Sequence, residues 1–294
     1  MMKIHNLRNL QLDDLYWILK FGFPKKKGTI YALRQESFAN LPQPVFFLST
    51  GRCGTKWFSN LLKKDKQFKV LHAPDPTFAM QGKLVYELFK GNPSSEQRKL
   101  MEEIFLSGRE SFLRYSYKCS RNIIESNNYV TFFAPLLYEL FPHAKFVHLY
   151  RHPGEFVRSG INRLYYTGKK NDDIKRIQPI YKEEQEQWEH YSQIEKISWL
   201  WRATNEYIES FKENLPEGKV CSFNFNQLNP ENVMGLVKFI GANITRRQIE
   251  KKLYKKANVQ RSVIKEHFTQ WPEHEKEQLR NVCWNLADKY GYSL

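Results

Sequence analysis

The chain has 294 residues, 41% of them hydrophobic, which is enough to bury one large α/β core. Its formal net charge of +15 favours an anionic ligand, a nucleic acid, an acidic polymer or an anionic membrane surface, and does not choose among them. The four cysteines lie far apart without paired spacing, so the sequence indicates neither a disulfide framework nor a metal site.

The chain has no run of about eighteen apolar residues, and its amino-terminal part has no apolar stretch with a cleavage site, so we predict a cytoplasmic protein. Residues 1–40 are predicted to form a helical extension packed on a single domain of residues 41–294. In that extension an amphipathic segment, Leu10 to Phe21, precedes the basic run Pro24 to Lys27. Weak association with a membrane surface, or docking of an acceptor, is the alternative interpretation of this pair.

Residues 44–57 read as an apolar run, a turn with two glycines and the start of a helix. The run from Val45 to Leu48 does not alternate, which predicts a parallel strand buried on both faces. Gly51 and Gly54 permit a tight turn, and amide groups at the following helix start attract an anion. Lys56 follows a threonine instead of preceding one, so the loop lacks the spacing of an ATP-binding Walker loop. Taken alone, the segment fits an ordinary strand-to-helix turn equally well.

A second strand is predicted over residues 68–71, and it ends in a loop with two prolines and two titratable side chains, His72 and Asp75. The sequence then alternates between helices and strands, as a parallel sheet requires. The predicted elements are helices over 78–90 and 96–107, with Ser95 capping the second, a strand over 114–118 and a helix over 132–141.

A second candidate anion site follows the strand predicted over residues 145–150. Arg151 stands at the carboxyl end of this strand, and Pro153 begins the next helix. Ser159 lies about two helical turns further on, on a face that can point toward the same groove. An arginine with a hydroxyl group is a good clamp for a phosphate.

The rest of the chain continues the α/β pattern, and we predict a three-layer fold with a central parallel sheet flanked by helices. Tryptophans 188, 199 and 201 are interpreted as core residues. The remaining predicted elements are a polar loop over 168–178, a helical stretch over 181–213 with a break allowed, a strand over 219–223, helices over 230–241 and 251–256, and a terminal helix over 272–289 that buries Leu279, Val282, Trp284 and Leu286.

The two anion motifs together resemble those of sulfotransferases that use 3′-phosphoadenosine 5′-phosphosulfate (PAPS), a family with a P-loop nucleoside-triphosphatase-like fold. Residues 49–57 look like that family's 5′-phosphosulfate loop, and residues 141–159 look like its 3′-phosphate motif. Weaker similarity covers residues 225–228 and the terminal helix. The resemblance implies transfer of a sulfuryl group from PAPS to a hydroxyl or amine, release of PAP, and no metal.

The resemblance also implies roles for individual residues in donor binding. Arg52 takes the place of a basic residue that neutralises charge on the leaving phosphosulfate, and Trp57 borders the adenine. Family members often have serine at the place of Cys53 and threonine at the place of Lys56, so the side-chain contacts there differ. The implied donor contacts are the backbone around Cys53 and Gly54, the side chains of Thr55 and Lys56 for the 5′-phosphate, Arg151 and Ser159 for the 3′-phosphate, and Arg261 closing over it.

The catalytic base and a second catalytic cation are less directly implied. Lys118 matches a lysine near the transferring group in several branches of the family. Ser120 stands where small-molecule members have a catalytic histidine, so the base must come from elsewhere. The loop after the second strand offers His72 and Asp75, and we favour His72 because its ordinary pKa of about 6.5 suits proton abstraction near neutral pH.

The acceptor is left open by the sequence. Basic loops mildly favour an acidic or sugar-bearing acceptor. A sugar or aromatic ring of the acceptor could stack on Tyr165, Tyr166 or Trp188, but packing in the core explains these three residues equally well. Two other functions compete with sulfuryl transfer. A P-loop nucleotide kinase needs magnesium and a hydroxyl residue after Lys56, where Trp57 stands instead. A nucleic-acid-binding protein fits the charge, but the basic residues are spread out and no specific nucleic acid is predicted as a partner.

Overall fold

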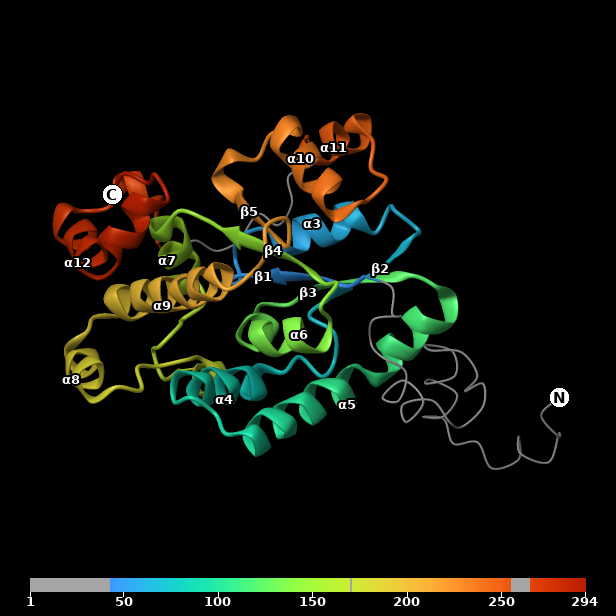
Figure 1. Ribbon diagram of the computed structural model, residues 1–294. Helices are drawn as coiled ribbons and strands as arrows, with labels where there is room; N and C mark the ends of the chain where they lie inside the picture. Colours follow the sequence, from blue (N-terminus) through green and yellow to red (C-terminus); the bar gives the residue numbers. More distant parts are fainter. Residues whose placement is uncertain (1–42, 170, 255–264) are drawn as a thin grey trace, which may run out of the picture.

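The computed structural model describes residues 43–169, 171–254 and 265–294. Its sheet has five strands, all parallel, in the order β2-β3-β1-β4-β5 (Figure 1). The central strand, β1, is buried along its whole length, as its apolar run predicts. The strands are β1 (Val45–Leu48), β2 (Phe68–His72), β3 (Asn122–Ser126), β4 (Lys145–Tyr150) and β5 (Val220–Asn224).

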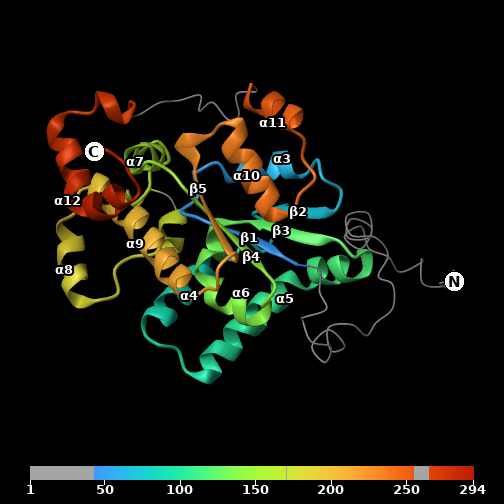
Figure 2. The ribbon, with the colours of Figure 1, turned by 45° about the horizontal axis from the view of Figure 1, so that its top comes forward.

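Helices cover both faces of the sheet, which confirms the predicted three-layer α/β fold (Figures 1 and 2). One face carries α3 (Thr55–Leu62), α10 (Pro230–Ile240) and α11 (Arg246–Leu253). The other face carries α4 (Ala79–Lys90), α5 (Ser95–Cys119), α6 (Ala134–Leu140) and α9 (Gln193–Glu213). The remaining helices are α7 (Pro153–Ile161), α8 (Lys182–His190) and α12 (Glu273–Lys289), with short 3₁₀ turns η3 (Asn128–Phe133), η4 (Asn171–Lys175), η5 (Phe225–Gln227) and η6 (Phe268–Gln270).

The third strand is not where the sequence predicts it. Residues 114–118 continue α5, and the strand is β3, which begins only at Asn122. A capping box starts α5, but Ser94 makes it and not Ser95: the Ser94 Oγ accepts from the Gln97 amide at 3.3 Å. Arg109 in this helix forms a buried ion pair with Glu125 of β3, so burial and charge both favour the longer helix.

This correction changes the position of Lys118. It lies in the last turn of α5, just before β3 begins, and not at the end of a strand. The loop after β1 lies at the carboxyl ends of the parallel strands. Because Lys118 precedes the amino end of β3, it lies at the opposite end of the strands. This position gives no support to the role of Lys118 as a second catalytic cation, which stays a prediction.

The carboxyl-terminal half agrees with the sequence pattern apart from one helix and one tryptophan. The helix predicted over residues 251–256 is α11, which begins earlier, at Arg246, and ends at Leu253; residues 255 and 256 lie outside the described residues. The break allowed in the helical stretch separates α8 from α9, and tryptophans 188, 199 and 201 are buried. Trp284 in α12 is 47% exposed, while Cys283 is 1% exposed and takes the inward position. At 3.6 residues per turn, positions 279, 282, 283 and 286 share one face, and position 284 falls outside it.

The predicted amino-terminal extension and Arg261 lie outside the described residues. Among the helices of the described ranges, none combines the length and the hydropathy needed to cross a membrane.

Candidate functional site

The two anion motifs meet at one edge of the sheet. Leu48 at the end of β1 is in register with His148 of β4, so the loops that follow these strands are neighbours. The Arg52 Nε donates a hydrogen bond to the Ser159 Oγ at 3.2 Å, across 107 residues of sequence. Arg151 Nη1 donates to the Arg52 carbonyl oxygen at 3.3 Å. The fold therefore brings together the residues that the sequence predicts for two separate phosphate groups.

The backbone of the first loop is shaped to hold an anion. Gly51, Arg52 and Gly54 have φ angles of +74°, +59° and +91°, all in the left-handed region. Left-handed residues among right-handed ones turn successive amide groups toward a common point, which makes a concavity for anions. Gly54 also caps α3, where no side chain accepts from the first amides, so these amides can face a ligand.

Three hydrogen bonds, two with η3 and one within the loop, fix this backbone. The Ser49 amide donates to the Thr131 Oγ1 at 3.0 Å, and that hydroxyl donates to the Ser49 carbonyl at 3.1 Å. The Gly51 amide donates to the Ser49 Oγ at 3.1 Å. Ser49 and Thr131 are both buried, so the loop is ordered by contacts that need no ligand.

Arg163 joins the site although the sequence analysis did not select it. Its Nη1 donates to the Ser159 Oγ at 3.1 Å, so two guanidinium groups converge on one hydroxyl. Burial and the neighbouring charge of Arg52 lower the pKa of Arg163. Burial likewise lowers the pKa of Arg151, opposed by its ion pair with Glu155. Bound anions would offset this repulsion.

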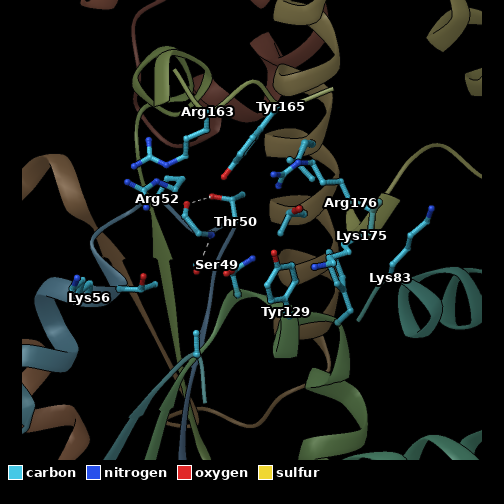
Figure 3. Close-up of a pocket in the computed structure, with 18 of the residues that line it drawn as sticks. Ser49, Thr50, Arg52, Lys56, Lys83, Tyr129, Arg163, Tyr165, Lys175 and Arg176 are labelled. Carbon is cyan, nitrogen blue, oxygen red and sulfur yellow. Dashed lines mark hydrogen bonds between the residues drawn. The ribbon is translucent and has the colours of Figure 1, made fainter. Parts of the chain in front are cut away.

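A cavity of about 420 Å³ opens beside the loop (Figure 3). Arg52, Thr55, Lys56 and Arg163 line one part of it. The other lining residues are Ser49, Thr50, Gly51, His72, Ala73, Lys83, Asn128, Tyr129, Phe132, Tyr165, Lys175, Arg176, Ile177, Leu200 and Thr204.

The structure separates the two candidate bases. His72 lines the cavity, whereas Asp75 is exposed and does not. The His72 Nδ1 lies 3.1 Å from the Ser126 carbonyl oxygen, an acceptor that assigns the proton to Nδ1 and leaves the Nε2 lone pair to accept a proton. Burial lowers the pKa of His72, and the charges of Lys56, Lys63 and Arg52 lower it further. His72 is therefore neutral at pH 7.

Several other predicted residues act through packing or backbone. Cys53 is fully buried, and burial raises its pKa to about 11, so its thiol stays protonated near neutral pH. Trp57 is 6% exposed and its ring lies 5.0 Å from that of Phe58, within the core between α3 and the sheet. The Tyr166 hydroxyl donates to the Ile177 carbonyl at 2.7 Å, and its ring packs edge-on against Trp188. Of the three aromatic residues predicted to border an acceptor, Tyr165 lines the cavity.

Comparison with known proteins agrees with this geometry. The model of the sulfotransferase family matches residues 44–246, which is more than half of the chain and includes both anion motifs. Among curated protein sequences, none matches.

Three solved sulfotransferase structures are similar to this chain. The sulfotransferase STF9 from Mycobacterium avium has a TM-score of 0.50 at 13% identity, covering 90% of this chain and 81% of its own. A sulfotransferase from Alicyclobacillus acidocaldarius has a TM-score of 0.48 at 14% identity over 86% and 97%. The sulfotransferase domain from the curacin biosynthetic pathway has a TM-score of 0.45 at 15% identity over 86% and 99%. At 13% identity, the likeness to STF9 concerns the fold alone.

Proposed function

The chain belongs to the sulfotransferase family, and on that premise we propose that it takes a sulfuryl group from PAPS, passes it to a hydroxyl or amine of an acceptor, and releases PAP. The observation that carries this proposal is the hydrogen bond between Arg52 and Ser159, which joins the two anion motifs. A donor with phosphate at both its 3′ and 5′ positions needs two adjacent anion sites, and the arginine cluster with the left-handed loop fits that need.

The residues divide between the two ends of such a donor. Amides around Gly54, with the Thr55 and Lys56 side chains, would hold the 5′-phosphate. Arg151 and Ser159, now joined by Arg163, would hold the 3′-phosphate. Arg52 belongs to the first motif and reaches Ser159 of the second, and from there its charge would stabilise the phosphosulfate oxygen that leaves.

When bound, PAPS supplies an activated sulfuryl group. His72 would accept the proton of the acceptor hydroxyl at its Nε2, because the Nδ1 faces the Ser126 carbonyl and the neutral ring is the base. That the reaction needs no metal, that the protein is cytoplasmic and that it binds no specific nucleic acid all stay predictions.

The test is thermal unfolding with PAP in a buffer containing EDTA. Saturating PAP should raise the melting temperature by at least about 5 °C, since a ligand that binds only the folded state stabilises it. Adenosine 5′-phosphate, which lacks the 3′-phosphate, is the control and should give a much smaller shift. No shift with PAP would refute the proposal.

Two further outcomes would favour the competing functions. Magnesium-dependent ATP turnover that Lys56→Ala abolishes would indicate a nucleotide kinase. Steeply salt-dependent binding of mixed-sequence RNA, unaffected by PAP, would indicate a nucleic-acid-binding protein.

A further inference from the structure

We propose that the acceptor carries a negative charge of its own, which Lys83, Lys175 and Arg176 bind at the end of the cavity away from Arg52 and Lys56. The inference rests on the proposed function, because it assigns this part of the cavity to the acceptor. It names a class of acceptor: a hydroxyl compound with a carboxylate or ester sulfate group.

The three cations come from two segments outside the sheet. Lys83 lies on α4, and Lys175 and Arg176 lie at the end of η4. The Lys83 Nζ donates to the Ile174 carbonyl at 3.3 Å, which joins α4 to η4. Figure 3 shows these three side chains on one side of the cavity, with Arg52, Lys56 and Arg163 on the other. The cavity therefore has two separate groups of positive charge.

Arg176 is held in a defined orientation by its neighbours. Its guanidinium group lies over the ring of Tyr165, 3.4 Å from the ring centre, and its Nε is 3.3 Å from the Asp173 Oδ1. The Asp173 carboxylate also accepts from the amides of Tyr166 and Gly168, at 2.9 and 3.0 Å. Within the described part of the chain, the ion pair between Arg176 and Asp173 is made through the Arg176 Nε. The two Nη groups of Arg176 can therefore donate hydrogen bonds to a ligand.

The charged side chains that line the described cavity are all positive. Six of the described lining residues are lysine or arginine, and no described lining residue is aspartate or glutamate. Asp173, the partner of Arg176, lies outside this lining. Lys83 has Glu87 at 3.9 Å, but that pair is partly exposed and therefore weak. A donor held by Arg52, Arg151 and Arg163 would offset the charge at its own end only. An anionic acceptor would offset the charge at the other end, and a neutral acceptor would not.

The test compares three 4-nitrophenyl glycosides that differ in one group: the neutral β-D-glucoside, its 6-sulfate and the β-D-glucuronide. Binding to the PAP-saturated protein is measured by calorimetry at constant ionic strength, and kcat/KM with PAPS is measured for any that react. We expect the sulfate or the glucuronide to bind at least about tenfold more tightly than the neutral glucoside, because hydrogen bonds to charged groups are the stronger ones. The two charged arms show which anion is preferred.

Variants then connect this preference to the three cations. Lys83→Gln and Lys175→Gln should each reduce the preference for the charged glycosides by about tenfold, and Lys83→Arg should retain it. Lys90→Gln is the matched control, because Lys90 lies on the same helix and does not line the cavity. Equal binding of all three glycosides, no binding of any, or a preference unchanged in both glutamine variants would overturn the inference.

The outcomes for donor and acceptor are distinguishable. A PAP-induced rise in melting temperature that persists in Lys83→Gln shows that the protein is folded and that the donor site is intact. With that rise present, loss of the charge preference concerns the acceptor alone. Without any PAP effect in the unaltered protein, the proposed function itself fails.

Discussion

The ring of Phe225 occupies the space that a side chain at Gly54 would need. A Cβ atom built on Gly54 would lie 2.0 Å from the Phe225 Cε2, and the φ angle of Gly54 is +91°. Phe225 begins η5 directly after β5, and Gly54 caps α3. Phe225, which follows the edge strand β5, therefore packs directly against the turn at Gly54 that shapes the anion loop.

Gly54→Ala should destabilise the protein and weaken PAP binding. The overlap with Phe225 costs about 1–3 kcal/mol, and the left-handed backbone adds about 1–2 kcal/mol for alanine. Urea unfolding measures the first effect and calorimetry the second. Gly235→Ala is the control, because no atom lies within 4 Å of its added Cβ and alanine favours the helix α10. Equal behaviour of the two variants would contradict the packing described here.

Ser159→Ala should weaken PAP binding by about tenfold to a hundredfold, because the lost hydroxyl meets two charged guanidinium groups. The melting temperature without ligand should change little. Ser198→Ala removes a comparable buried hydroxyl, one that donates to the Ile194 carbonyl at 2.8 Å within α9. Its affinity for PAP should equal that of the unaltered protein. If both variants bind PAP normally, Ser159 is not part of the donor site.

The pH dependence of kcat/KM should show an acidic limb below pH 6.5. The neutral ring of His72 is the base, and burial with the charges of Lys56, Lys63 and Arg52 lowers its pKa, so the rate falls only as the pH drops through that lowered value. His72→Gln should lower the rate and remove the limb. Asp75→Asn should leave the rate and the acidic limb unchanged, since Asp75 lies outside the cavity lining. A limb that disappears in Asp75→Asn instead would reverse the assignment.

Arg109→Met should lower the free energy of unfolding by about 3–5 kcal/mol, because it leaves a carboxylate buried without its partner. The Arg109 and Glu125 side chains are 2% and 1% exposed and joined at 2.6 Å. Arg98→Met is the control on the same helix: its pair with Glu139 is 40% and 52% exposed, so the loss should stay below about 1 kcal/mol. Denaturant unfolding measures both. Adding Glu125→Leu to Arg109→Met should recover part of the lost stability.

The sequence predicts those parts of the fold that depend on local pattern. The apolar runs at Val45 and at Lys145 give β1 and β4, and the motifs after them give Arg52, Arg151 and Ser159. Residues 114–118 alternate between polar and aromatic side chains like a strand, yet they continue α5. The true strand, β3, contains the buried charge of Glu125, and its partner in space is not visible in a local pattern.

In the candidate site too, some residues have a signal in the local sequence and others do not. Arg163 stands four residues after Ser159 and two residues beyond the end of α7, and this short separation in sequence was a usable signal. Lys83 and Arg176 carried no such signal, because their place in the cavity depends on how α4 and η4 pack against each other. The sequence offered both His72 and Asp75 as the catalytic base, and the structure distinguishes them because His72 is partly buried and Asp75 is exposed.

The order of the strands has a consequence for how such a protein changes its specificity. Both anion loops follow adjacent central strands, β1 and β4, whose register fixes their separation. The three cations proposed for the acceptor lie on α4, on η4 and directly after η4, and none of these segments contributes a strand to the sheet. Grafting α4 and η4 from another sulfotransferase should therefore redirect the enzyme to a new acceptor and leave its donor requirement intact.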